Sequence, residues 1–264
     1  MQQLDENIFQ GKAIVKAMYK RIHLSETEST NSYFKELLSA GIDFEGLTLA
    51  DADFQTGGRG QAGNSWESNK GENLTFSLLC SPIFIPASSQ FYLSQVIALA
   101  VWTTLNDIVE GVSIKWPNDI YWHDKKICGI LIESDLRGST IAHSILGVGL
   151  NINQTTFLSD APNPVSLAQI VGFSLDRDKI LNNLIGNFEK YYEILRQGHL
   201  EEIRTNYLSH LYRKEGIYPF ATADGKTFMA EIVDVEPSGM LVLRHTDGSL
   251  CKYEFKQVKW ILNT

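Results

Sequence analysis

The feature that most constrains this chain is a glycine-rich stretch at residues 54–68, FQTGGRGQAGNSWES. Glycine lets the backbone reach positive φ angles and approach a ligand closely, so that successive N–H groups can converge on an anion. Arg59 adds the one full positive charge in the GRG segment. On glycine content alone, a ligand-binding loop and a flexible surface turn are equally good interpretations.

A second motif favours the ligand-binding loop. The sequence KWPND, residues 115–119, follows an apolar run, which places Lys115 at the end of a predicted strand. Further along, KKICGILIES at 125–134 has the pattern of a buried strand preceded by two lysines, and GVGLNIN at 147–153 ends a strand on asparagines. Polar groups at strand ends beside a glycine-rich loop indicate a binding site.

Together with Ser29, Thr30 and Asn31, these motifs resemble the biotin protein ligase family, over roughly residue 22 to the C-terminus. The order GRG, then Trp66, then KWPND is highly specific. The resemblance implies an α+β fold, in which a mixed sheet packed with helices, of the biotin/lipoate ligase type, precedes a small SH3-like β-barrel. It resembles the catalytic form of the family that has no N-terminal DNA-binding domain, for which we see no room in 264 residues.

We accordingly predict three parts of the chain. Residues 1–20 form a leader of unknown role, residues 21–212 a biotin- and ATP-binding catalytic domain, and residues 213–264 the SH3-like domain. After Arg213 the apolar period changes to two, with turn sequences between short segments, which is typical of a small barrel.

Hydrophobic periodicity predicts the individual elements, with the helices on one face of the sheet. Ser29 or Thr30 caps the first helix, and Asp176 caps a long one that ends near Gly198. The predicted strands of the first sheet are 20–25, 46–53, 73–80, 112–115, 120–122, 127–134 and 141–151, and those of the barrel are 216–220, 228–235, 240–244, 249–255 and 258–262. The other predicted helices are 88–109, 166–171 and 200–212.

Composition excludes several classes of protein. A net charge of −8 and a pI near 5.3 argue against a nucleic-acid-binding surface, which needs clustered lysine and arginine. No run approaches the ~20 apolar residues of a membrane span, and no signal peptide is visible. Cys80, Cys128 and Cys251 have no zinc or disulfide spacing, so we expect a cytoplasmic protein.

The resemblance implies a two-step reaction. The carboxylate of biotin attacks the α-phosphorus of ATP to give biotinyl-5′-adenylate, and a lysine of a biotin carboxyl carrier protein then takes the biotinyl group. Two anions must therefore meet, which at 4 Å costs about 4 kcal/mol at an effective dielectric constant of ~20. The implied catalytic cations are Lys115 and Arg59, whose ordinary alternatives are a surface lysine and a solvated loop charge.

The resemblance also implies ligand contacts. The biotin-binding residues are Ser29, Thr30, Asn31, Gln55, Gly58, Arg59, Gly60, Gln61 and Lys115. The ATP-binding residues are Trp66, Lys126 and Asn151. Helix capping is the alternative for residues 29–31, and packing against the fold is the alternative for Trp66. Magnesium would be held mainly by ATP phosphates, and we assign it no protein ligand.

One position departs from the family pattern. Many relatives have GRGR where this chain has GRGQ, so Gln61 stands in place of an arginine that helps to hold the anionic intermediate. Two other functions remain open from the sequence: a lipoate-type ligase of the same fold, and a biotin sensor without catalysis. The oligomeric state is also open, because the family contains both monomers and ligand-induced homodimers.

Overall fold

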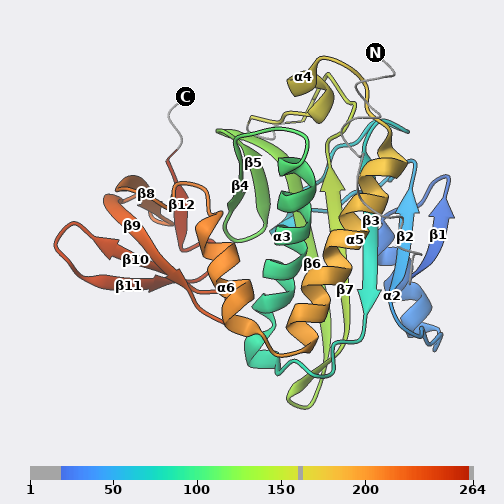
Figure 1. Ribbon diagram of the computed structural model, residues 1–264, viewed down its shortest axis with the longest axis horizontal. Coiled ribbons are helices and arrows are strands. Elements are labelled where there is room, and N and C mark those ends of the chain that lie inside the picture. Colours follow the sequence, from blue (N-terminus) through green and yellow to red (C-terminus); the bar gives the residue numbers. More distant parts are fainter. Residues whose placement is uncertain (1–18, 160–162, 262–264) are drawn as a thin grey trace.

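The fold is built on a seven-stranded mixed sheet (Figure 1). The computed structural model describes residues 19–159 and 163–261. In the strand order β1-β2-β3-β7-β6-β5-β4, β1 and β2 are parallel and each other neighbouring pair is antiparallel. The strands are β1 (Lys20–Leu24), β2 (Thr48–Ala52), β3 (Leu74–Cys80), β4 (Val112–Lys115), β5 (Asp119–Trp122), β6 (Lys125–Arg137) and β7 (Thr140–Leu150). The predicted fold class is confirmed. Most of the predicted leader lies outside the described residues, although Lys20 already pairs with β2.

Three helices cover one face of this sheet. They are α3 (Phe91–Asn106), α5 (Arg177–Arg196) and α6 (Leu200–Ser209), and Figure 1 shows α3 and α5 running side by side across it. Helix α3 contacts both α5 and α6 as well as the strands, and Leu93, Ile97 and Leu99 on it are fully buried. A helix that is apolar nearly all around can be stable only in such a sandwiched position.

The predicted placement of all helices on one face is wrong. Helix α2 (Thr30–Ser39) packs on the opposite face, where Phe34 contacts Ala50, Leu79 and Ile145. Side chains alternate between the two faces along a strand, and the neighbour Leu78 belongs instead to the core beneath α3. This face also carries the cavity described below.

Two helix boundaries differ from the prediction for tertiary reasons. The predicted helix 88–109 is a 3₁₀ turn, η2 (Ala87–Ser89), followed by α3, which ends at Asn106. The predicted helix 200–212 ends at Ser209, because the chain then pairs with β4: the Ile114 N–H donates to His210 O, and the Tyr212 N–H to Ile114 O, each at 2.8 Å. The short helix α4 (Leu167–Val171) ends on Gly172, as predicted, and Ser166 is its N-cap instead of its first residue.

A second, five-stranded antiparallel sheet forms the predicted barrel region, at the opposite end of the molecule from β1 (Figure 1). Its order is β11-β10-β9-β8-β12. The strands are β8 (Tyr218–Thr222), β9 (Thr227–Val235), β10 (Leu241–His245), β11 (Leu250–Tyr253) and β12 (Val258–Trp260). The Trp116 indole N–H donates to Gly239 O at 2.9 Å, joining the 115–119 turn to this module. The exact domain boundaries stay a prediction.

A charge cluster holds the parallel edge of the large sheet. The Asp51 side chain, on a residue only 6% exposed, accepts from Arg21 Nε at 2.7 Å and lies 2.8 Å from His23 Nδ1. Burial alone would raise the pKa of Asp51, but the hydrogen bonds from Arg21 and His23 lower it below its ordinary value. The hydrogen bond to Asp51 in turn raises the pKa of His23.

This pair predicts a pH-dependent contribution to stability. A histidine whose pKa is raised on folding stabilises fully below its unfolded pKa of about 6.5 and loses that contribution as pH rises through the folded pKa. His23→Gln should therefore lower the free energy of unfolding more at pH 5.5 than at pH 9, by under about 1 kcal/mol because the side chain is half exposed.

The measurement is urea denaturation at both pH values. His199→Gln is the matched control, since the nearest carboxylate oxygen to His199, in Glu202, is 3.9 Å away. An equal loss at pH 5.5 and pH 9 for His23→Gln would contradict the prediction.

Candidate functional site

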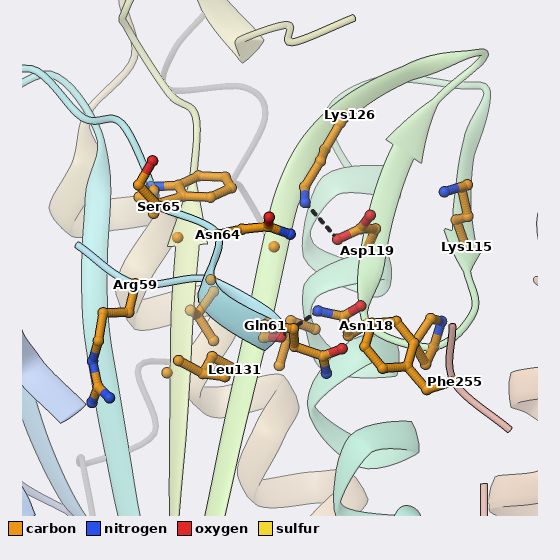
Figure 2. Close-up of a pocket in the computed structure, with 18 of the residues that line it drawn as sticks. Arg59, Gln61, Asn64, Ser65, Lys115, Asn118, Asp119, Lys126, Leu131 and Phe255 are labelled. Atoms are coloured by element: carbon orange, nitrogen blue, oxygen red, sulfur yellow. Dashed lines mark hydrogen bonds and ion pairs between the residues drawn. The ribbon is translucent and has the colours of Figure 1, made fainter. Parts of the chain in front are cut away.

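A cavity of about 590 Å³ lies beside the N-terminus of α2, between the glycine-rich loop, the 115–119 turn and the C-terminal module (Figure 2). Ten of the twelve predicted site residues line it: Ser29, Thr30, Asn31, Gln55, Arg59, Gly60, Gln61, Trp66, Lys115 and Lys126. Gly58 and Asn151 are not among its lining residues. Residues from four separate stretches of the sequence are therefore gathered around one space.

The glycine-rich loop provides a hydrogen-bond acceptor for the N-terminus of α2. Ser29 occupies the N-cap position with an extended backbone, but Gln55 Oε1 accepts from the Thr30 N–H at 2.8 Å and from Thr30 Oγ1 at 3.1 Å. The Ser77 hydroxyl lies 2.6 Å from both Thr30 Oγ1 and Asn31 Oδ1. This buried polar network orients Thr30 and Asn31. Ser77 was not predicted from the sequence, because a serine inside a strand has no distinguishing pattern.

The floor of the cavity consists of glycines on β6 and β7. A Cβ atom at Gly147 would lie 2.3 Å from Asn31 Oδ1, and one at Gly149 would lie 2.3 Å from Trp66 Cε2. A Cβ at Gly129 would lie 2.9 Å from Trp66 Cζ3. Trp66 thus packs directly on strand backbone. Trp66 therefore packs against the fold, which was the alternative to a ligand contact, and it also borders the cavity.

Two lysines stand at one end of the cavity. Lys115 ends β4 as predicted, and its Nζ lies 4.7 Å from the centre of the Tyr121 ring. Burial lowers the pKa of Lys115; Asp119 opposes this shift, whereas Lys126 adds to it. The Lys126 Nζ pairs with Asp119 Oδ1 at 2.7 Å. Lys115 is therefore a partly desolvated cation that borders the cavity.

Arg59 lies elsewhere. Figure 2 shows its side chain pointing away from Lys115, and its guanidinium pairs with Glu133 Oε2 at 3.2 Å. The two predicted catalytic cations are thus not brought together in this structure. The sequence analysis did not single out Glu133.

The loop itself is closed by its own backbone. The Trp66 N–H donates to Gly58 O at 2.9 Å, and the Gly60 N–H to Asn64 O at 2.7 Å. Asn151, which follows β7, is 3% exposed and donates from Nδ2 to Val165 O at 3.1 Å. Its Oδ1 is buried without a hydrogen-bond partner among the described residues. That oxygen is an acceptor still available close to the cavity.

The C-terminal module also contributes to the cavity wall. Its lining residues are Phe255, Lys256, Val258, Lys259 and Trp260. The sequence carried no indication of this, because these residues fit an ordinary short strand and turn. Of the side chains that are charged at neutral pH among the described lining residues, five are basic (Arg59, Lys115, Lys126, Lys256 and Lys259) and one, Asp119, is acidic. A chain of net charge −8 therefore surrounds this cavity with positive charge.

Within residues 19–159 and 163–261, none of the helices combines the length and the apolar character that a membrane span requires. Within the same ranges, we find no group of three or more His, Cys, Asp or Glu side chains that could hold a metal ion.

Comparison with known proteins agrees with the geometry. Residues 24–151 match the model of the biotin/lipoate A/B protein ligase family. The chain is 30% identical over 208 residues to the bifunctional ligase/repressor BirA of Bacillus subtilis, an alignment that covers 76% of this chain and 62% of BirA. It thus spans about three-fifths of that relative's length.

Two further comparisons cover most of this chain. The biotin–[acetyl-CoA-carboxylase] ligase of Paracoccus denitrificans is 29% identical over 234 residues, covering 85% of this chain and 94% of that protein. In fold, the chain is similar to a biotin protein ligase from Aquifex aeolicus in complex with biotin and ATP. The TM-score is 0.75 at 24% identity, covering 92% of this chain and 99% of the other.

The close contact at Gly149 predicts that an alanine there and an alanine at Gly186 on α5 change the free energy of unfolding in opposite directions. Gly149→Ala forces a methyl group into the Trp66 indole and should lower the free energy of unfolding by about 1–3 kcal/mol, as overpacking does. Gly186→Ala, in the middle of α5 with nothing within 4 Å of its added Cβ, should instead raise it by about 0.5–1 kcal/mol. Urea denaturation of both variants checks this, and a neutral Gly149→Ala would show that Trp66 is free to move off the strand.

Proposed function

Because residues 24–151 match the model of the biotin/lipoate A/B protein ligase family, we propose that this chain is an ATP-dependent biotin ligase. It forms biotinyl-5′-adenylate with release of pyrophosphate, and then transfers the biotinyl group to a lysine of a biotin carboxyl carrier protein with release of AMP. The observation that carries the proposal is the cavity with five basic side chains and one carboxylate among its described lining residues, in a chain of net charge −8. Such a cavity suits a ligand pair that is anionic at its reacting centre.

The N-terminus of α2 supports a role in holding the ureido ring of biotin. That ring has two N–H donors and one carbonyl acceptor, and Ser29, Thr30, Asn31 and Gln55 offer hydroxyl and amide groups of both kinds. Their mutual hydrogen bonds orient them before the ligand arrives. Gln55 is an amide, which can both donate and accept, whereas a carboxylate could only accept.

Lys115 supports adenylate formation. In the first step the carboxylate of biotin approaches the α-phosphate of ATP, and their repulsion is about 4 kcal/mol at 4 Å and an effective dielectric constant of ~20. A cation that is already positioned and partly desolvated offsets that repulsion without reorganising solvent. Lys115 has these properties, and its ammonium must stay protonated to act.

The nucleotide would lie toward Trp66, Lys126 and Asn151. The indole ring borders the cavity, the Lys126 ammonium is held by Asp119, and Asn151 keeps a buried acceptor for a base N–H. Asp119 is the one carboxylate among the described lining residues, so magnesium would depend mainly on ATP phosphates and water for its ligands. This fits the preference of that ion for few protein carboxylates.

The decisive experiment is mass spectrometry of an apo carrier protein incubated with this protein, biotin, ATP and magnesium. The proposal expects one added biotinyl group on the carrier lysine. Modification with lipoate but not biotin would indicate a lipoate-type ligase. Biotin binding without any modification of the carrier would indicate a sensor.

Lys115→Ala should slow biotin-dependent pyrophosphate release by about 10²-fold or more while the protein stays folded. Lys190→Ala, on the exposed surface of α5, is the control and should keep the normal rate. Since burial lowers the pKa of Lys115, the wild-type rate should fall as pH rises through that pKa, before the ~10.4 of a free lysine. A folded Lys115→Ala protein with a near-normal rate would remove this residue from the mechanism.

Gln61 predicts a faster loss of the intermediate than an arginine would give. Its side-chain Oε1 is buried without a hydrogen-bond partner among the described residues, and an amide brings no charge to the phosphate. Hydrogen bonds to charged groups contribute ~1.5–3 kcal/mol against ~0.5–1.5 for neutral ones. Gln61→Arg should therefore slow the release of preformed biotinyl-adenylate by up to about tenfold.

Stopped-flow fluorescence of preformed complexes measures that release. Gln197→Arg, at the exposed end of α5, adds the same charge far from the cavity and should leave the rate unchanged. Equal or faster release from Gln61→Arg would show that charge at this position does not control retention.

A further inference from the structure

Glu133 connects helix α2 with the glycine-rich loop, the two segments whose side chains rest on the glycines of the cavity floor. It lies on the same face of β6 as Gly129, which underlies Trp66. Its Oε1 accepts from Lys35 Nζ at 2.6 Å, and its Oε2 accepts from Asn31 Nδ2 at 2.8 Å and from Arg59 at 3.2 Å. One carboxylate therefore serves helix α2 and the glycine-rich loop at once.

The three donors differ in how firmly they are held. Asn31 is 2% exposed and is fixed by Ser77 and by Leu131 O as well. The side chains of Lys35 and Arg59 are 47% and 40% exposed, and Arg59 is the more distant from the carboxylate. Burial alone would raise the pKa of Glu133, but Lys35, Asn31 and Arg59 together lower it, so the group is an anion. Of the three contacts, the one to Arg59 is therefore the easiest to exchange.

We propose that Glu133 is a resting counter-ion for Arg59, which the guanidinium leaves when an anionic ligand enters the cavity. Lys35 stays behind and neutralises Glu133, so that the carboxylate does not pull Arg59 back. Glu133 and Lys35 are thus positioning residues that act through Arg59. The inference rests on the proposed function for the identity of the anion, the phosphate of biotinyl-adenylate.

The movement of Arg59 from Glu133 to the ligand predicts the direction in which each substitution changes the affinity for the adenylate. Without the charge of Glu133, Arg59 has no ion pair to break before it reaches the ligand, so the adenylate should bind more tightly. Without Lys35, Arg59 is the one cation left on Glu133 among the described contacts, so the ligand should bind more weakly. Exposed ion pairs contribute ~0.2–1 kcal/mol, which limits each change to about fivefold in Kd.

The test uses Glu133→Gln and Lys35→Met in the full chain, with chemically prepared biotinyl-5′-adenylate titrated by calorimetry. Glutamine keeps an oxygen that can accept from Asn31, so the polar network survives. Glu36→Gln, at an exposed position on the same helix as Lys35, is the control for loss of one negative charge and should not change Kd.

A direct effect of the altered charge on the anionic ligand would also tighten binding in Glu133→Gln and weaken it in Lys35→Met. The two substitutions are therefore repeated in an Arg59→Met background. Under the proposal their effects disappear in that background, because both act through Arg59. Amide exchange over residues 58–65 of the ligand-free protein should also be faster in Glu133→Gln, since the loop loses its contact with β6. Thermal unfolding confirms that each variant is folded.

Three results would overturn the inference: unchanged effects in the Arg59→Met background, weakening by both substitutions, or no effect of either. The first would show a direct effect of charge on the ligand, and the second a purely structural role in holding Asn31. Failure of the wild-type protein to bind biotinyl-adenylate at all would instead refute the proposed function. Biotin methyl ester, which has no charge at the carboxyl end, should bind Glu133→Gln and Lys35→Met alike.

Discussion

The cavity depends on the closeness with which two side chains approach the backbone of β6 and β7. Asn31, from α2, rests on Gly147, and Trp66, from the glycine-rich loop, rests on Gly149 and Gly129. Any side chain at these glycines would need the space that the amide and the indole occupy. Helix α2 and the glycine-rich loop therefore both approach the sheet closely, and both border the cavity. The glycines that matter most here are those of the strands, where a Cβ atom is excluded by contact.

The charges of the site follow from this arrangement. An acidic chain gathers basic side chains around one cavity, and they are not equivalent. Lys115 is partly desolvated, Lys126 is paired with Asp119, and Arg59 is paired with Glu133. A site for two anionic reactants benefits from cations that are already in place, because solvent then has less to reorganise. The pairings also keep these cations from repelling one another in the ligand-free protein.

The C-terminal module is tied to the same site from the other side. Trp116 donates to Gly239, and Arg213 NH1 donates to Ile261 O at 2.9 Å. The 115–119 turn that presents Lys115 is thus held from behind by the module, while Lys256 and Lys259 of the module line the cavity. Loss of the module would therefore both loosen the turn and remove part of the wall.

By itself, the sequence determined the order of the strands and helices along the chain, the glycine-rich loop and the position of Lys115 at a strand end. These are local properties: period, turn residues and motif spacing act over a few residues and leave their pattern in the chain. Helix ends were less predictable where a distant strand competed for the backbone, as β4 does beyond Ser209.

The tertiary structure alone decided how these pieces meet. Helix α2 packs on the face opposite α3, and Gln55 accepts a hydrogen bond from the Thr30 N–H. Ser77 contacts Thr30 and Asn31, and Arg59 forms an ion pair with Glu133. These polar contacts of Gln55, Ser77 and Arg59 join residues that lie 25 to 74 positions apart. No short pattern records such a partner, because serine, glutamine and glutamate are ordinary residues wherever they occur. Only the register of the strands and the packing of α2 made them neighbours.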